Sequence, residues 1–308
     1  MSRVLWAIAA ALVVGVGGTV VHLYSGMNAF RVVEVGDDVH VIEVERLGGN
    51  VGVLATGQGA VVVDTMTFRF QGEQLLEMAE RLGRGPVQAV INTHYHQDHT
   101  HGNSAFPAGT KVIATRRTRD YLLHFDGEAW QGDARDLLPN ETFDDVSELR
   151  VGQKTIRSLH PGRGHTGGDL VVHFVEDRVI HAGDLVFHER YPNIDLEGGG
   201  SLREWIATLD RVLELDFERV IPGHGAVTGR EGLAGFQRFL RELWAVGEEA
   251  AREGLSLEDT LARAELGEDR GYQVISFPLV FRLDRDFAIR RAWEEATGAV
   301  RPQAVPAS

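Results

Sequence analysis

The sequence of 308 residues contains no cysteine. This absence excludes disulfide bonds, thiolate metal ligands and a cysteine nucleophile together. It does not identify a redox compartment, because an exported chain need not carry cysteine. Metal binding or catalysis in this chain must therefore use other side chains.

Basic residues are few relative to acidic ones. Lys and Arg total 31 against 45 for Asp and Glu, which gives a net charge of −14. An acidic surface repels phosphate groups, so the composition argues against a nucleic-acid partner and against binding to anionic lipid through a basic patch. With 43% hydrophobic residues, a chain of this length can bury the core of one large domain or two small ones.

The N-terminal segment has neither charge nor proline between residues 4 and 21. This run is longer than the core of a typical signal peptide and just long enough to cross a bilayer as a helix. Because no clear small-residue cleavage site follows, we expect residues 1–29 to form an uncleaved membrane anchor rather than a cleaved signal segment. The remainder is then exported, either periplasmic or held at the inner membrane with the catalytic domain outside the cytoplasm. A buried core helix is the alternative.

The rest of the chain mixes strand and helix patterns. Residues 30–65 alternate with period two around the turns "GDD" and "TGQG", which predicts an antiparallel meander. A helix is predicted at "GEQLLEMAERLG", followed by strands at "VQAVINTH", "TKVIAT", "KTIRSLHP", "DLVVHFVEDRVIHAGD" and "FERVIPGHG". Ser201 and Ser256 are predicted helix caps. Residues 30–229 therefore read as an α/β domain, and residues 230–308 as a helical C-terminal extension.

The stretch "INTHYHQDHTHGN", residues 91–103, holds four histidines and one aspartate within eight residues. Imidazole favours neither a helix nor an apolar core, so this density needs a chemical reason. His94 and His96 share one face at the end of a strand, and the following turn presents Asp98 and His99. This arrangement suits two adjacent metals better than one. A solvated histidine-rich loop is the alternative.

Three later segments, each after a predicted strand, offer partners for this cluster. His165 lies in "GRGHTGGD", Asp184 in "IHAGDLVF" and His224 in "VIPGHGAV". Each is weak alone, but in this order they accompany the H-x-H-x-D-H motif. Imidazoles and carboxylates of this kind are ligands for zinc and, less exclusively, for iron or manganese. The alternative is a non-catalytic binding protein that the metal stabilises.

On these motifs, the chain resembles the metallo-β-lactamase superfamily over about residues 30–229. The resemblance implies a four-layer αβ/βα sandwich with two divalent metal ions, zinc in the first place, at one edge between the sheets. It implies that the first metal is held by His94, His96 and His165. It likewise implies that Asp98, His99 and His224 hold the second metal and that Asp184 bridges the two. The segment "AGDLVFHERYPNID" is also similar to exported hydrolases of this superfamily associated with quinoprotein and sulfur-oxidation systems.

The resemblance implies a hydrolase in which a metal-bound hydroxide attacks a small carbonyl-type or ester-type substrate, with Asp98 as the catalytic side chain that orients the hydroxide or collects its proton. True β-lactamases of the superfamily usually lack a bridging carboxylate at the position of Asp184, whereas glyoxalase II-like thioesterases, lactonases and phosphodiesterases have it. We therefore predict a thioester, a lactone or a related ester. Hydrolysis of β-lactams, as main or promiscuous activity, and a persulfide dioxygenase-like oxidation at a single iron are the alternatives.

Several further side chains are candidates around the site. Asp64 resembles the superfamily's aspartate that steadies the histidine loop from behind, although a turn-capping role is equally compatible with "VVVDT". His188 and Tyr191 are candidates for the substrate pocket, whose shape is expected to depend on residues 125–142 and on the extension. Four other histidines are predicted to be structural: His101, His160, His173 and His181. For His160 and His181, the alternative is that they orient a ligand imidazole.

Overall fold

The computed structural model describes residues 29–44, 48–277 and 280–307. The predicted N-terminal anchor therefore lies outside the described residues, apart from its last position. Among the helices within these ranges, none is long and apolar enough to cross a membrane.

The first sheet has seven strands that follow one another in chain order. The first four strands pair antiparallel, which confirms the predicted meander, and the last three pairings are parallel. The strands are β1 Phe30–Glu34, β2 Val39–Val44, β3 Val51–Ala55, β4 Ala60–Val63, β5 Val87–Ile91, β6 Val112–Thr115 and β7 Glu141–Phe143.

The second sheet has six strands in the order β13-β12-β11-β10-β9-β8. The pairing of β11 with β12 is parallel and the others are antiparallel. Strands β7, β8 and β13 were not predicted, and all three lie at sheet edges. In β8 every second side chain is exposed, and the strand carries charged residues instead of an apolar run, so its sequence does not resemble a buried strand. The strands are β8 Val146–Val151, β9 Lys154–Leu159, β10 Val171–Phe174, β11 Val179–Phe187, β12 Arg219–His224 and β13 Thr228–Gly229.

Alternate side chains of both sheets face two different apolar layers. Val61 of β4 packs between the sheets with residues of β10, whereas the next residue, Val62, faces Leu75 of helix α2 (Arg69–Gly83). On the far side of the second sheet, Trp205 of α5 (Leu202–Leu213) belongs to another buried cluster. Burying one aliphatic side chain, such as Val61 or Leu75, stabilises the fold by about 1.5–3 kcal/mol. Helix, sheet, sheet and helix thus form the predicted αβ/βα sandwich.

Short helices follow the strands of the first sheet at the edge where the histidine motif lies. Thr115 caps one of them by accepting from the backbone N–H of Thr118 at 3.0 Å. These elements are α3 Gln97–Thr100, the 3-10 helix η1 His101–Ala105, α4 Arg116–Phe125 and the 3-10 helix η2 Gly132–Leu137.

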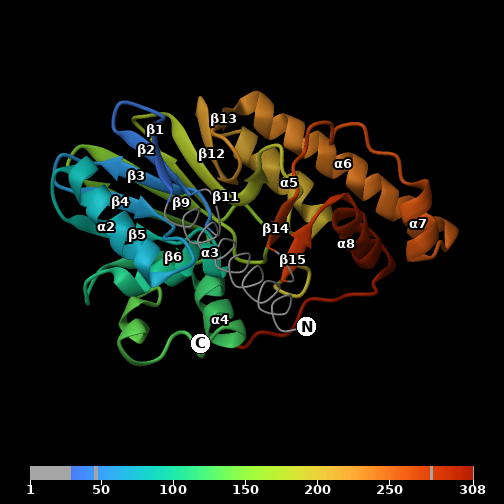
Figure 1. Cartoon of the computed structure of the whole chain (residues 1–308), viewed down its shortest axis with the longest axis horizontal. Coiled ribbons are helices and arrows are strands. Elements are labelled where there is room, and N and C mark those ends of the chain that lie inside the picture. The colour runs from blue at the N-terminus through green and yellow to red at the C-terminus, as the bar shows by residue number, and fades with distance from the viewer. Residues whose placement is uncertain (1–28, 45–47, 278–279, 308) are drawn as a thin grey trace, which may run out of the picture.

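The C-terminal extension consists of α6 Arg230–Glu253, α7 Leu257–Arg263, a hairpin of β14 Ile275–Phe277 and β15 Phe281–Leu283, and α8 Arg285–Thr297. Figure 1 shows its three helices grouped on the side of the molecule away from α2. The two predicted caps are confirmed, since Ser201 and Ser256 accept from backbone N–H groups three residues on. The hairpin was not predicted, so the extension is not purely helical.

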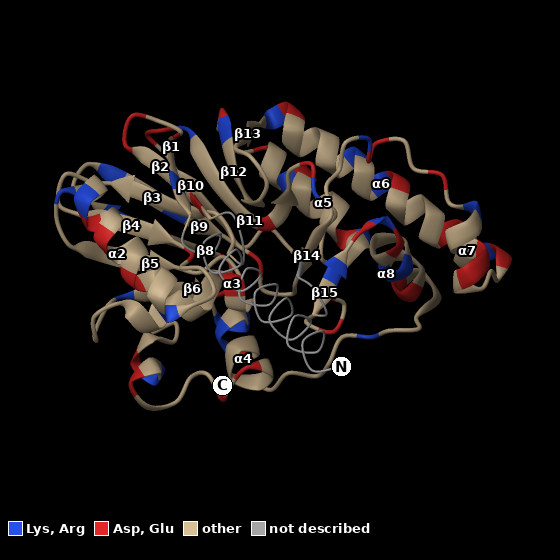
Figure 2. Ribbon diagram, in the orientation of Figure 1, with Lys and Arg blue, Asp and Glu red and all other residues tan. Residues whose placement is uncertain are grey.

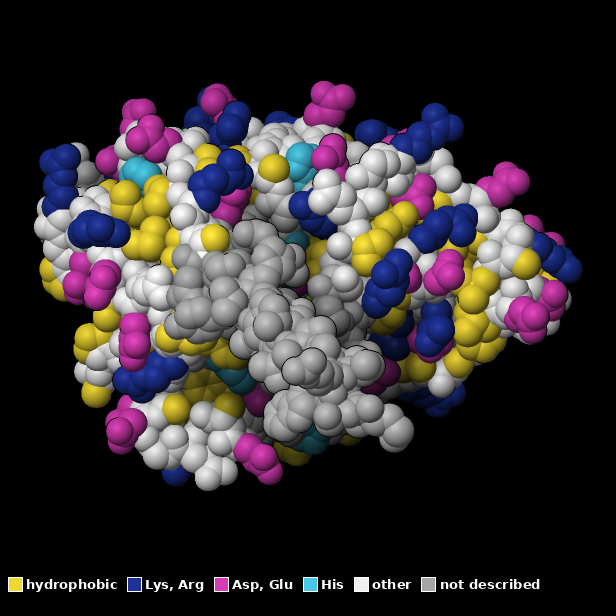
Figure 3. Space-filling view, in the orientation of Figure 1, with side chains coloured by type: hydrophobic (Ala, Val, Ile, Leu, Met, Phe, Trp, Pro, Cys, Tyr) yellow, Lys and Arg dark blue, Asp and Glu magenta, His cyan; other side chains and the backbone are white. Residues whose placement is uncertain are grey.

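Charged residues of both signs are interspersed along the helices and loops (Figure 2), and their side chains are spread over the visible face of the molecule (Figure 3). Many form exposed ion pairs, such as Arg178 with Glu218 and Arg238 with Glu268. Such exposed pairs contribute little to stability.

Candidate metal centre

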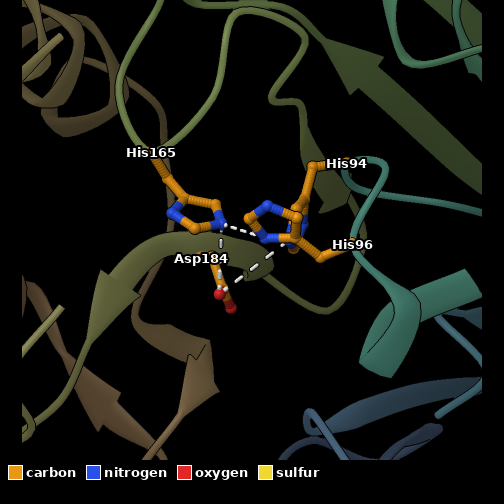
Figure 4. A group of neighbouring side chains, drawn as sticks. All are labelled: His94, His96, His165 and Asp184. Carbon is orange, nitrogen blue, oxygen red and sulfur yellow. Dashed lines mark hydrogen bonds and ion pairs between the residues drawn. The ribbon is translucent and has the colours of Figure 1, made fainter. Parts of the chain in front are cut away.

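The seven predicted ligands lie in two groups at one edge of the sandwich. His94, His96, His165 and Asp184 form the first, and Asp98, His99 and His224 form the second; within each group the candidate ligand atoms lie within 4.8 Å of one another. Figure 4 shows contacts from His165 and His94 to the Asp184 carboxylate and from His96 to His165. The side chains come from the ends of β5 and β12, from α3, from the loop after β9 and from within β11.

Asp184 reaches this edge because β11 is irregular. The register with β12 shifts on both sides of Gly183, whose φ of +50° is in the left-handed region. A side chain on Gly223 of the neighbouring strand would overlap Asp184 Oδ1, so glycine is needed there for close approach. The "GHG" segment thus leaves room for the carboxylate.

The two oxygens of Asp184 face different groups. Oδ2 lies 3.4 Å from His165 Nε2 and 3.9 Å from His94 Nε2. Oδ1 lies 3.2 Å from His99 Nε2 and 3.5 Å from His224 Nε2. One carboxylate thus presents an oxygen to each group, which is the arrangement expected of a bridging ligand.

Asp98 completes the second group. Its Oδ2 lies 3.2 Å from His224 Nε2 and 3.5 Å from His99 Nε2. Its side chain is 33% exposed, whereas that of His99 is fully buried. Asp98 is therefore both close to the imidazoles and reachable from solvent.

Asp64 holds the histidine segment from behind. Its Oδ2 accepts from His99 Nδ1 at 2.8 Å, and it accepts from both the backbone N–H and the hydroxyl of Thr93 at 2.8 Å. The residue is fully buried and has a φ of +65°. These contacts agree with the steadying role that the family resemblance implied.

The outer nitrogens of the first group also have hydrogen-bond partners. His165 Nδ1 donates to the carbonyl of Asn193 at 2.8 Å, and His96 Nε2 donates to Asp195 Oδ2 at 3.1 Å. His94 Nδ1 lies 3.1 Å from the Thr93 hydroxyl, whose proton is already given to Asp64, so the imidazole donates here. Sequence reasoning missed these acceptors, because nothing in the spacing marks them.

These outer contacts decide the tautomers. A neutral imidazole that donates from one nitrogen keeps a lone pair on the other. The lone pairs of His165 Nε2 and His96 Nδ1 then face each other across 2.8 Å, an arrangement that needs a proton or a metal cation between them. His94 Nε2, His99 Nε2 and Asp184 Oδ1 are buried without a hydrogen-bond partner. The donor set therefore fits divalent cations.

The imidazoles of the first group differ in protonation. Burial opposes the charged form of His96, but the hydrogen bond to Asp195 raises its pKa, so without a cation the proton between His96 and His165 belongs to His96. Burial lowers the pKa of His94 well below its usual value and that of His165 to about 4, so both are neutral near pH 7. Burial opposes the charged form of Asp184, but His224 and His99 hold its pKa well below the usual range. Neutral imidazoles and an ionised carboxylate are the metal-binding forms.

The second group carries a proton when no metal is bound. Burial would lower the pKa of His224, but the carboxylates of Asp184 and Asp98 raise it to about 9. A cation that binds here must displace this proton, so metal binding releases protons.

The two predicted pocket residues differ in position. His188 directly follows β11; its backbone N–H donates to the His224 carbonyl at 2.9 Å, and its Nδ1 donates to the Ala226 carbonyl at 2.8 Å. Tyr191 is buried, donates its hydroxyl to Asp269 at 2.9 Å and packs against the ring of Phe239. His188 thus adjoins a predicted ligand, whereas these contacts of Tyr191 are with the extension.

Two of the other histidines bond to backbone groups instead of ligand imidazoles. His181 Nε2 donates to the Asn50 carbonyl at 3.1 Å and its Nδ1 accepts from Gly183, so the idea that it orients a ligand imidazole was wrong. His160 Nδ1 donates to the Asp169 carbonyl at 2.6 Å.

The other two histidines that were predicted to be structural, His101 and His173, belong to neither group of ligands. His173 Nε2 donates to the Asp216 carbonyl at 2.9 Å. His101 contacts Asp126 and lies on the wall of a cavity of about 170 Å³ whose lining includes Trp130. Residues 125–142 thus contribute to a cavity close to the histidine motif.

Comparisons with known proteins place this chain in one family. A model of the metallo-beta-lactamase superfamily matches residues 44–224, and the chain belongs to that superfamily. It is similar to metallo-beta-lactamase type 2 from Bacillus sp. (strain 170), with 29% identity over 192 residues, 61% of this chain and 71% of that protein. It is also similar to a linear primary-alkylsulfatase from Pseudomonas sp. (strain ATCC 19151), with 22% identity over 228 residues, 60% of this chain and 43% of that protein.

Solved structures show the same fold. The metallo-beta-lactamase from Pontibacter korlensis superposes with a TM-score of 0.61 at 21% identity and covers 69% of this chain and 99% of its own. For DIM-1 metallo-beta-lactamase, the TM-score is 0.57 at 22% identity, and the match covers 69% of this chain and 97% of that chain. The predicted family and fold class are thus confirmed.

Proposed function

We propose that this chain is a dinuclear metal-dependent hydrolase of a small ester-type substrate: a thioester, a lactone or a related ester. Membership of the superfamily and the two groups of ligands support metal-dependent hydrolysis in general. The observation that carries the dinuclear proposal is the Asp184 carboxylate, which directs one oxygen to each group.

Two bound divalent cations, zinc in the first place and iron or manganese as alternatives, would supply Lewis acidity that polarises a substrate carbonyl and acidifies water. His94, His96 and His165 would hold one, Asp98, His99 and His224 the other, and Asp184 would contact both. The fixed outer hydrogen bonds keep the imidazole lone pairs turned inward before any ligand binds. Such preorganisation avoids the cost of reorienting dipoles during the reaction.

The exposure of the ligands indicates the side from which a substrate approaches. The side chains of Asp98, His96 and His224 are 33%, 21% and 17% exposed, whereas His94, His99 and His165 are at most 1% exposed. A substrate therefore reaches the centre over the three exposed residues.

Asp98 is the side chain suited to orienting the attacking water. Burial opposes its ionisation, but the imidazoles of His99 and His224 hold its pKa well below the usual value. The ionised carboxylate accepts hydrogen bonds, so it can orient the attacking water. A carboxylate with so low a pKa holds a proton only weakly, so orientation is its principal role.

Hydrolysis of β-lactams is the second candidate, because several relatives are named metallo-beta-lactamases. The bridging carboxylate at position 184 favours the ester-type substrate, since the family resemblance associates it with thioesterases and lactonases. Export and membrane attachment through residues 1–29 belong to the same proposal.

The purified full-length protein is assayed with a thioester, a lactone, a phosphodiester, an alkyl sulfate, a β-lactam and a persulfide, in air and without oxygen, after loading with zinc or iron. We expect zinc to support anaerobic turnover of an ester-type substrate. Turnover of the β-lactam alone would select the second candidate. A reaction on a persulfide that requires iron and consumes O₂ would overturn the hydrolase proposal in favour of a dioxygenase.

A further inference from the structure

One loop after β11 contacts two ligands of the first group. Asn193 accepts through its carbonyl from His165 at 2.8 Å, and Asp195 accepts through its carboxylate from His96 at 3.1 Å. Two residues that are two positions apart thus fix the outer nitrogens of two imidazoles. The residues from Tyr191 to Ser201 contain no helix or strand, so the position of this loop depends on its contacts.

Ile194, between these two residues, is held by the C-terminal extension. Its carbonyl accepts from Arg291 Nε at 2.8 Å, and its side chain is fully buried. Arg291 lies on α8 and is only 9% exposed. Its guanidinium also pairs with Glu197 of the same loop and, at 2.7 Å, with Glu294 of α8. The rigid fork of arginine thus joins the loop to the helix.

A second contact fixes the far end of the loop. Glu295 of α8 accepts from the Ser201 hydroxyl at 2.6 Å and from the backbone N–H of Leu202 at 2.7 Å. Figure 1 shows α8 on the same side of the molecule as α5, which begins at Leu202. The helix therefore contacts the loop near the metal ligands and again where the loop enters α5.

The loop is also packed tightly around Asp195, the residue that orients His96. The backbone N–H of Gly198 donates to Asp195 Oδ1 at 2.9 Å. A Cβ at Gly198 would overlap Asp195 Oδ2 and lie 2.5 Å from the Tyr95 hydroxyl. A small shift of this loop would thus move the carboxylate that orients His96.

The second group is supported differently. The outer nitrogen of His99 is held by Asp64, at the end of β4 on the first sheet. The described contacts of Arg291 and Glu295 are with the loop, with the start of α5 and with α8. A change in α8 therefore acts on one group and spares the other.

We propose that α8, through Arg291, positions the 193–195 loop and thereby sets the metal affinity of the group formed by His94, His96 and His165. This proposal rests on the proposed function, because it requires cations to bind at the site. It gives the C-terminal extension a role at the metal centre without direct contact with a ligand. Arg291 is a positioning residue, not a catalytic one.

The test is a zinc titration of the metal-free full-length protein against a chromophoric chelator. His96→Ala identifies the equivalent that belongs to the first group, because it removes one ligand of that group. Arg291→Met keeps most of the aliphatic stem and removes the donors. Its control is Arg290→Met, which changes an exposed arginine of the same helix. Far-UV circular dichroism of each metal-free variant checks the fold.

We expect Arg291→Met to weaken the first-group equivalent by about 10-fold, the low end of the effect of removing a residue that itself orients a ligand, because Arg291 acts one contact further out. The second equivalent and the Arg290→Met control should keep wild-type affinity. Unchanged first-group affinity in folded Arg291→Met would overturn the proposal, as would an equal loss at both groups.

A second pair of variants decides the matter if Arg291→Met does not fold. Gly198→Ala should shift Asp195 and weaken the same equivalent selectively, whereas Gly235→Ala is the matched control, since an added Cβ there meets only Arg238 at 3.5 Å. Wild-type affinity in Gly198→Ala would then overturn the proposal. If the wild-type protein binds a single equivalent, the dinuclear function fails, and the proposal for Arg291 is judged on whether that equivalent weakens.

Discussion

Replacing Asp184 by asparagine tests the two-metal centre most directly. The substitution keeps the size of the side chain and removes its charge. The Asp184 oxygens lie 3.2–3.9 Å from imidazole nitrogens of both groups. A cation shared between such atoms lies within about 4 Å of the carboxylate, and at an effective dielectric constant of about 20 a unit charge pair at that distance interacts by about 4 kcal/mol.

The solvent does little to screen this interaction, because the Asp184 side chain is only 4% exposed. An interaction of about 4 kcal/mol corresponds to roughly a thousandfold in affinity. The desolvation of the carboxylate, which is lost with the charge, offsets part of this effect. We therefore expect Asp184→Asn to weaken both metal equivalents by about 100- to 1000-fold.

The assay is elemental analysis after dialysis, together with a zinc titration of the metal-free protein. Asp177→Asn is the matched control, because Asp177 is also 4% exposed and pairs with Lys154 instead of an imidazole. It should lower stability but leave the metal content at about two equivalents. If folded Asp184→Asn keeps two equivalents with wild-type affinity, the bridging role of Asp184 is refuted.

Further outcomes follow from the same geometry. Asp98→Asn should lower the rate by about 100- to 1000-fold, measured on the substrate that the panel identifies, because the amide lacks the charge that orients the attacking water; a rate within tenfold of wild type would exclude Asp98 as the catalytic side chain. Asp64→Asn should weaken the second metal equivalent by about 10- to 100-fold in the zinc titration, because the hydrogen bond to His99 is weakened; selective loss of the first equivalent would contradict this. Ser256→Ala should lower the free energy of unfolding by about 1 kcal/mol in urea titrations without changing the metal content. Full-length protein should sediment with membranes, whereas a variant lacking residues 1–29 should stay in the supernatant with its metal content unchanged; recovery of the full-length chain in the soluble cytoplasmic fraction would argue against the anchor.

Local patterns of the sequence were sufficient for much of the fold. The meander at residues 30–65 and the caps at Ser201 and Ser256 depend on period-two alternation and on neighbours three residues away. The edge strand β8 and the hairpin of β14 and β15 were missed, because a strand that is largely exposed lacks the apolar pattern of a buried one. Prediction thus failed where burial did not shape the sequence.

In the candidate site, too, one part could be predicted from the sequence and another could not. The ligand positions could be proposed because H-x-H-x-D-H is a local motif and the later positions follow strands in a known order. The acceptors behind the ligands could not, apart from Asp64, which the family resemblance suggested. Asp195 lies 99 positions from His96, and Arg291 lies 97 positions from Ile194. No periodicity or spacing links residues at such separations, and only the packed chain brings them together.

The ligand residues alone do not make a metal site. An imidazole presents a lone pair inward only if its other nitrogen donates outward, and here the outward acceptors come from separate parts of the chain. Asp64 orients His99 from the first sheet, and the 193–195 loop, held by Arg291, orients His96 and His165. Without these acceptors each ring could turn or change its tautomer, and mutual repulsion of the lone pairs would favour doing so in the absence of metal. On this proposal the metal affinity of the centre depends on the sandwich and the C-terminal extension together, although the seven ligand positions all precede residue 230.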